Sequence, residues 1–419
     1  MGRTLTPKDC HALMNLLVKQ ATGQQSIAVT DTSSFISAGE KVLETGMENV
    51  INSLNIVLGR TLISARPYDA KLTLMEEMNT DLYTSRLRKI SFYSKLAKPS
   101  GAFNTDLYSN LHEGFTAGQN PDSEGTAQST KSQWEQNPPH ALEMNFGGSS
   151  TWQMAITTYE VQLQNAFRSE SEFAQFVSGY MTEFANDISS MREAWNRMNL
   201  LNKIASVYDM SDNMEGSVVN LTKRFNDRFG TSYTSAELRS TYLKEFLAFF
   251  VSEFKLASEH MTERTSKYHW SPENVEGDIL LRHTPYSAQR VYLFNELFTE
   301  AESLVLPQIF NPNYLNIKTQ YEKIGYWQSV EDRARIKVVP SVVDADTGLQ
   351  KAGTEVDIPY VVGMITDKDG LMTNFMLDKI ASTSLEARKL FRNTWHTYLR
   401  NAINDNTENC VIFIMKDED

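Results

Sequence analysis

Seven histidines and two cysteines are the side chains of this chain best suited to metal binding or nucleophilic chemistry. The histidines are scattered, with no pair four residues apart and no His-Glu-x-x-His sequence, so their spacing predicts no zinc site. Cys10 and Cys410 lie near opposite ends of the sequence, which indicates two reduced, unreactive thiols in a cytoplasm. Neither residue type predicts a catalytic centre.

Acidic side chains are the next candidates for ligand or acid–base chemistry. The turns Asp344–Gly348 and Asp367–Gly370 resemble calcium loops, but both lack the further oxygen ligands and the closing Glu of an EF-hand. Asp-Gly between apolar runs is typical of a hairpin turn. Glu76 and Glu77 are adjacent and would diverge on a helix, so a solvated face explains them. Because phosphate-loop and Gly-x-Ser-x-Gly sequences are also missing, we expect no catalysis, no cofactor and no metal.

Composition limits the remaining classes of function. The chain has 419 residues, 41% hydrophobic and 22% charged, as in a soluble globular protein of two or three domains. The net charge of −12 argues against nucleic-acid binding, which needs clustered Lys and Arg. No segment approaches the roughly 20 apolar residues of a membrane span, and no signal-peptide pattern is present. We therefore expect a soluble protein that is neither exported by a signal peptide nor anchored.

One basic segment contrasts with this acidic chain. Residues 83–100 contain five basic residues and no acid: Arg86, Arg88, Lys89, Lys95 and Lys98. Two interpretations stay open, a solvated strand face and an arm that lies on an acidic neighbouring subunit. Residues 116–141 are rich in Gly, Gln, Asn, Ser, Thr and Pro, which predicts a polar loop.

A long helix is the main element that the sequence predicts. Residues 151–167 alternate as a strand does, with Trp152, Met154 and Ile156 on one face. Ser169 and Glu172 then form a capping box for a helix that extends to Tyr208, about 58 Å at a rise of 1.5 Å per residue. Its apolar stripe, which we interpret as core, comprises Phe173, Phe176, Val177, Tyr180, Phe184, Ile188, Met191 and Trp195.

Shorter helices and strands complete an α+β pattern. Helices are predicted from Thr6-Pro7, over 35–62, after a capping box of Thr234 and Glu237, and over 288–304. Strands are predicted at 337–340, 360–365 and 410–415.

The order of these elements resembles the Hong Kong 97-type fold of tailed-bacteriophage major capsid proteins, in particular those of short-tailed phages. The residues 360–365, 391–396 and 411–414 resemble the closing strands of that family. The resemblance implies a peripheral sheet and a chain of five parts: an N-terminal arm and first helical region (1–81), an extended β loop with strands (82–167), the spine helix of the peripheral domain (168–210), an axial domain with central helices (211–349), and C-terminal strands that close the sheets (350–419). It implies an extended conformation for 384–403, whereas the local spacing of apolar residues there favours a helix.

The resemblance also implies a function. A family member self-assembles into hexamers and pentamers that form an icosahedral shell around packaged double-stranded DNA, in a virion assembled in the host cytoplasm. The N-terminal region is too short for a cleavable scaffolding segment, which implies a separate scaffolding protein, with a portal protein at one vertex and a possible decoration protein. No pair of residues matches the covalent crosslink of some relatives.

Three alternatives stay open, one of which is an adaptor or other phage structural component that forms a ring of defined small number in place of a closed shell. The shell of an encapsulin-like nanocompartment shares the fold and carries cargo in place of DNA. A soluble α+β enzyme would use the polar loop as a lid over a site that no motif marks.

Overall fold

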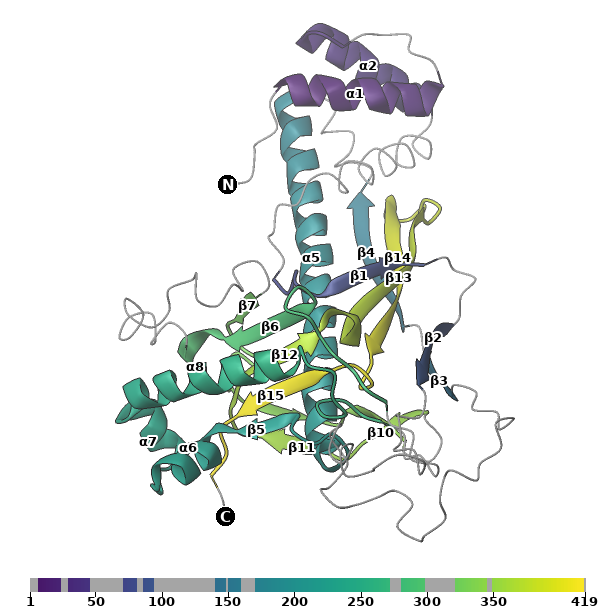
Figure 1. The fold of residues 1–419 in the computed structure, drawn as a ribbon. Helices are drawn as coiled ribbons and strands as arrows, with labels where there is room; N and C mark the ends of the chain where they lie inside the picture. Colours follow the sequence, from purple (N-terminus) through teal and green to yellow (C-terminus); the bar gives the residue numbers. More distant parts are fainter. Residues whose placement is uncertain are drawn as a thin grey trace, which may run out of the picture.

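A long helix and two separate sheets form the body of the protein (Figure 1). The computed structural model describes residues 7–23, 29–45, 71–80, 86–93, 140–147, 150–159, 170–271, 280–297, 321–344 and 349–417. The predicted α+β class is confirmed by this mixture of helices and mostly antiparallel sheets. Among these residues, no helix combines the length and apolar character needed to cross a membrane.

The predicted long helix is α5 (Glu170–Asp209), which runs without interruption for 40 residues past Gly179. Phe184 and Trp195 of the predicted stripe are buried, and Ile188 and Met191 are half-buried. The side chains of Phe173, Phe176, Val177 and Tyr180, like the capping residue Ser169, lie outside the described part of the chain. The most buried section of α5 is its last third, because both sheets pack there.

A four-stranded sheet lies along α5. Its order is β1 (Glu76–Asn79), β13 (Leu371–Ser382), β14 (Phe391–Asn404) and β4 (Ser150–Tyr159), with only the β1–β13 pair parallel. Two ring contacts join the sheet to α5: Trp152 with Trp195, 5.7 Å between centroids, and His396 with Phe184, 5.8 Å.

The helix predicted from the local spacing in 384–403 is wrong, because most of this segment is the extended strand β14. Alternate residues of β14, from Arg392 to Arg400, are buried, which is the two-residue period of a strand. The segment is rich in Thr and aromatic residues, and it pairs with β13 on one side and β4 on the other. Pairing along both edges therefore overrides the local spacing of Leu385, Phe391, Trp395 and Leu399.

A five-stranded sheet forms the second layer, in the order β5 (Val218–Asn220), β15 (Cys410–Ile414), β12 (Val361–Asp367), β6 (Gln289–Phe294) and β7 (Tyr321–Ile324). Every residue of β12 and β15 is buried. Helix α8 (Leu243–His260) covers this sheet through Phe250 and Phe254, whose rings lie 5.8 and 5.6 Å from that of Phe413. The prediction of a terminal strand is thus confirmed, and this strand, β15, lies within the core.

The predicted helix over 288–304 is wrong in its described part. Residues 289–294 form β6, which pairs with β12 on one side and β7 on the other, and only residues 295–297 are helical. Its apolar run, Val291 to Phe294, fits a strand buried on both faces as well as a helix, so periodicity alone did not separate them.

Two smaller predictions concern turns and caps. The capping box is confirmed: Thr234 N donates to Glu237 Oε2 at 2.8 Å, ahead of α7 (Ser235–Ser240). Asp367 begins the short helix η4 (Lys368–Gly370), which joins β12 to β13 in different sheets, so the expected hairpin there is wrong. The strands β9 (Ser341–Val343) and β10 (Gln350–Ala352) do form a hairpin around the other Asp-rich turn.

The remaining elements lie around this body. Helices α1 (Pro7–Thr22) and α2 (Thr32–Glu44) pack on each other at one end of α5 (Figure 1), and the predicted helix over 35–62 leaves the described residues after 45. Helix α6 (Leu221–Phe229) lies against β5 and β15 of the five-stranded sheet. The short helix η3 (Ser211–Asn213) and the pair β8 (Ile336–Val338) with β11 (Val356–Ile358) lie against α5. The hairpin of β2 (Arg86–Tyr93) and β3 (His140–Gly147) lies at the side of the body (Figure 1).

Candidate assembly interface: the β2–β3 hairpin and its anchor

The hairpin that carries the basic segment has two different faces. In its antiparallel register Arg88, Ile90 and Phe92 alternate with Lys89 and Ser91, so the two sets point to opposite faces. Ile90 and Phe92 are 45% and 70% exposed, whereas Ser91 is buried. The outward face is therefore partly apolar, and the inward face of β2 carries the polar Lys89 and Ser91 beside Leu87, which packs against the core.

On the outward face, Arg88 pairs with Glu143 of β3 at 2.6 Å, and both side chains are well exposed. A hydrogen bond from Asn145, together with Arg88, holds the pKa of Glu143 below its usual range. This pair lies within the hairpin and links it to no other element. Of the other basic residues singled out by the sequence, the Arg86 side chain, Lys95 and Lys98 lie outside what the structure describes.

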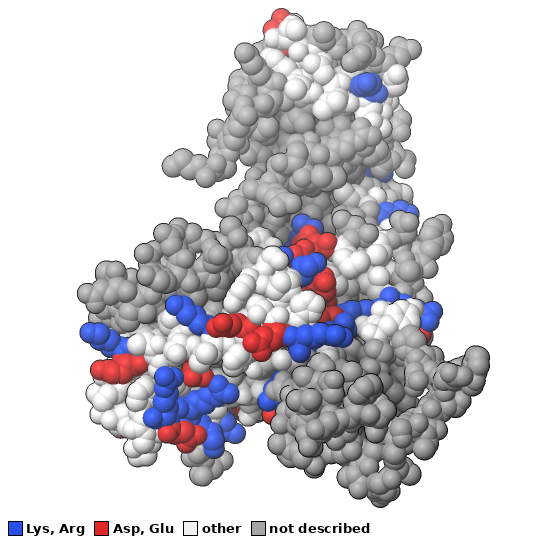
Figure 2. Space-filling view, viewed as in Figure 1, with Lys and Arg blue, Asp and Glu red and all other residues white. Residues whose placement is uncertain are grey.

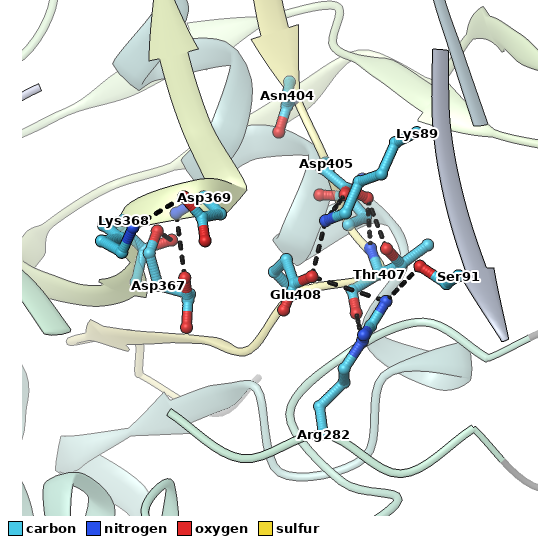
Figure 3. A network of polar contacts seen from close by, with 12 residues as sticks. Lys89, Ser91, Arg282, Asp367, Lys368, Asp369, Asn404, Asp405, Thr407 and Glu408 are labelled. Carbon is cyan, nitrogen blue, oxygen red and sulfur yellow. Dashed lines mark hydrogen bonds and ion pairs between the residues drawn. The ribbon is translucent and has the colours of Figure 1, made fainter. Parts of the chain in front are cut away.

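On the inward face, Lys89 contacts acidic groups of its own chain. Its Nζ binds the carboxylate of Asp405 and lies 2.5 Å from Oε1 of Glu408 (Figure 3). Burial alone would lower the pKa of Lys89, but the two carboxylates outweigh it and raise that pKa. Lys89 is thus a charged link between the hairpin and the body of the same subunit.

The acceptors belong to a buried polar turn, residues 404–409, between β14 and β15. Asp405 accepts hydrogen bonds from the backbone N–H and hydroxyl of Thr407, at 2.9 and 2.7 Å. Arg282 joins the turn to the hairpin: its Nε donates to Thr407 O at 3.1 Å, and a terminal nitrogen donates to Ser91 Oγ at 2.7 Å (Figure 3). The same guanidinium lies 3.4 Å from Glu408.

The spine helix holds this turn from the other side. Lys203 of α5 is fully buried, and its Nζ donates to the backbone oxygen of Asp405 at 2.7 Å and to Asn406 Oδ1 at 3.0 Å. Burial lowers the pKa of Lys203. His269 also supports the turn, since its Nδ1 lies 3.1 Å from Asn409 Oδ1, and burial lowers its pKa.

The two carboxyl groups of the turn respond differently to this setting. Burial would raise the pKa of Asp405, but Lys89 and Thr407 outweigh it and hold that pKa below its usual range. For Glu408, burial dominates over Lys89 and Arg282 and raises the pKa. Asp405 is therefore the more firmly charged partner of Lys89.

This arrangement favours positioning over catalysis. Each acid lies against a cation or hydrogen-bond donor, and within the described ranges no three His, Cys, Asp or Glu side chains gather as metal ligands. Glu76 and Glu77, on β1, pair with Arg290 and Arg192. Sequence reasoning missed the turn at 404–409, because a run of Asn, Asp, Thr and Glu between strands is typical of a solvated loop.

Comparisons with known proteins give a likeness at the level of structure. No protein-family model and no curated protein matches the chain. The capsid structure of Staphylococcus phage Andhra is similar, with a TM-score of 0.51 at 11% identity over 84% of this chain and 87% of that one. A structure of the head fiber and inner core protein of native bacteriophage P68 has a TM-score of 0.48 at 12% identity, over 82% and 83% of the chains. The fold assignment rests on the first of these.

Proposed function

We propose that this chain, which has the Hong Kong 97-like fold of phage capsid proteins, is the major capsid protein of a tailed bacteriophage. It would self-assemble into hexamers and pentamers of an icosahedral shell around packaged double-stranded DNA. The observation that carries the proposal is the likeness to the Andhra capsid structure over 84% of the chain. The spine helix, the two sheets and the laterally placed hairpin support the proposal as parts of such a fold.

The surface fits a protein that encloses DNA without binding it. The net charge is −12. On the face in Figure 2 acidic and basic side chains are interspersed. On α6, Arg224 and Arg228 both pair with Glu253. A surface of mixed sign offers few of the unpaired cations that bind phosphates. We place the protein in the virion, with a separate scaffolding protein, a portal protein at one vertex and a possible decoration protein as partners.

The extended loop (82–167) is the proposed arm between neighbouring subunits. Its described hairpin exposes Arg88, Ile90 and Phe92, a mixed face of the kind found at protein interfaces. In this proposal Arg86, Arg88, Lys95 and Lys98 contact an acidic neighbour, and Lys89 contributes by orienting the hairpin. The spine (168–210), axial domain (211–349) and closing strands (350–419) would form the body of each shell subunit.

Particle size tests the function directly. The chain is expressed alone and together with a candidate scaffolding protein, then examined by sedimentation and negative-stain imaging. Closed shells or sheets of hexamers are the expected result. A monodisperse monomer or dimer under both conditions would contradict the shell function and favour the alternative of a soluble enzyme.

Charge reversal tests the arm. We expect Arg86→Glu with Arg88→Glu to reduce particle yield at least several-fold while the subunit stays soluble, because in this proposal both cations face an acidic neighbour. Lys89 is left unchanged, since its contacts lie within its own chain. Reversal of Lys323, a basic residue of β7 away from the hairpin, is the matched control. An unchanged particle yield in the double variant would contradict the proposal that the arm contributes to the interface between subunits.

A further inference from the structure

The two strands of the hairpin are attached to the body by different chemistry. Met144 and Phe146 of β3 are each 2% exposed and belong to the main core, and Asn401 Nδ2 donates to Phe146 O at 3.1 Å. On β2, Lys89 and Ser91 face the body through polar contacts. The β3 side is thus held mainly by apolar burial, whereas the β2 side combines ion pairs and one hydroxyl contact with Leu87, which is partly buried against the core.

The ion pairs of β2 join groups of unequal burial. The side chain of Lys89 is 29% exposed, whereas those of Asp405 and Glu408 are 0% and 11% exposed. If β2 moved away, Lys89 would regain water, but the Asp405 carboxylate would stay in the protein without its cation. Burying an uncompensated charge is costly, so the attached position of β2 is favoured strongly.

The turn does not depend on Lys89 alone. Lys203 donates to Asp405 O and Asn406 Oδ1 from the spine helix, and Thr407 donates twice to the Asp405 carboxylate. These contacts involve no atom of the hairpin. The β2 contacts can therefore break while the turn remains in place.

We propose that Lys89 and Ser91 of β2, with Asp405, Glu408 and Arg282 of the body, form a releasable latch that sets the angle of the hairpin about its fixed β3 side. With the latch closed, Arg88, Ile90 and Phe92 face outward, because in the strand register they lie on the side of β2 opposite Lys89 and Ser91. With it open, the hairpin takes a second orientation while the spine helix and both sheets are unchanged. The latch is a property of the single chain and stands whether or not the chain forms a shell.

Hydrogen–deuterium exchange of the full chain tests the latch. Lys89→Gln removes the cation, and Arg88→Gln, on the neighbouring residue, removes a charge that is paired within the hairpin. An isolated two-stranded hairpin is marginally stable in water, so opening should speed exchange of its amides. We expect at least tenfold faster exchange in 86–93 for Lys89→Gln, a smaller acceleration in 140–147 because β3 stays on the core, and less than a twofold change in either strand for Arg88→Gln.

Two results would overturn the latch. One is equal exchange of the hairpin in the two variants. The other is an equal acceleration in β12 for Lys89→Gln, because the substitution would then weaken the whole fold. Asp405→Asn provides a second route, since the amide oxygen can still accept from Thr407 while the charge is lost. Asp405→Asn should speed exchange of β2 as much as Lys89→Gln does, and the double variant should exchange no faster than either single variant. If the two accelerations multiplied in the double variant, Lys89 and Asp405 would not act through one shared contact.

Discussion

The centre of the five-stranded sheet and the β2–β3 hairpin differ in what holds them. β12 and β15 are buried along their whole length, and Phe413 of β15 contacts the rings of Phe250 and Phe254. The hairpin has an exposed outer face and is oriented by Lys89. Apolar burial is strong and has little directionality, whereas charge pairs fix direction and can exchange partners. The comparison separates a part that maintains the fold from a part suited to contacts between molecules.

The largest expected effect comes from replacing one phenylalanine by alanine in each of the two regions. Phe413→Ala should lower the free energy of unfolding by about 3–5 kcal/mol, because a fully buried ring leaves a cavity. Phe92→Ala, at a position 70% exposed, should change it by less than about 0.5 kcal/mol. Urea unfolding followed by circular dichroism measures both. Similar losses for the two variants would refute the distinction.

A glycine substitution tests how tightly the central sheet is packed. A Cβ on Gly363 of β12 would lie 2.8 Å from Tyr292 O and 2.9 Å from a methyl carbon of Leu293, so β6 would have to move. We expect Gly363→Ala to cost about 1–3 kcal/mol. Gly325→Ala is the control, because within the described part of the chain no contact is found within 4 Å of its Cβ position. Equal thermal midpoints for the two variants would mean that β12 and β6 separate easily.

The smallest expected effect is the pH dependence of the latch. The pKa of Asp405 is lowered from 3.8, so its stabilising charge is present above about pH 4 and is lost as pH falls through the lowered value. The pKa of Lys89 is raised from 10.5, so its contribution is present below that pH and is lost as pH rises through the raised value. On acidification Glu408, whose pKa is raised, is neutralised before Asp405.

The stability difference between the wild type and Lys89→Gln should therefore be about 1–2 kcal/mol between pH 6 and 10, given that Lys89 is partly exposed. It should shrink below pH 4 and above pH 11. Urea midpoints of both proteins across this range provide the measurement. A difference that does not vary with pH would show that the Lys89 contacts are not electrostatic.

Local patterns in the sequence predicted the elements that local interactions control. The capping box at Thr234 and Glu237 involves residues three apart, and it forms as expected. The spine helix also follows from contacts within a few turns, and it continues past Gly179. The apolar run from Val411 to Ile414 was recognisable as a strand because of its β-branched and aromatic residues.

Elements that depend on distant partners were harder to predict. The segments 289–294 and 391–404 carry apolar spacings that a helix also permits. They became strands because distant β12 and β4 pair with them, together with the adjacent strand β13. Lys89 was identified as basic, but its partners lie more than 300 positions away. Spacing within one segment carries no information about such pairs.

The amino-acid sequence alone established the α+β class, the spine helix, the acidic character of the chain and the basic segment at 86–98. Folding in three dimensions determined the burial of the polar turn at 404–409 and the use of Lys89 inside its own chain. The physical reason is that helix propensity and capping depend on residues close in sequence, and net charge depends on composition alone. Burial of a charge depends on which cations the rest of the chain brings to it, here Lys203 from the spine and Lys89 from the hairpin.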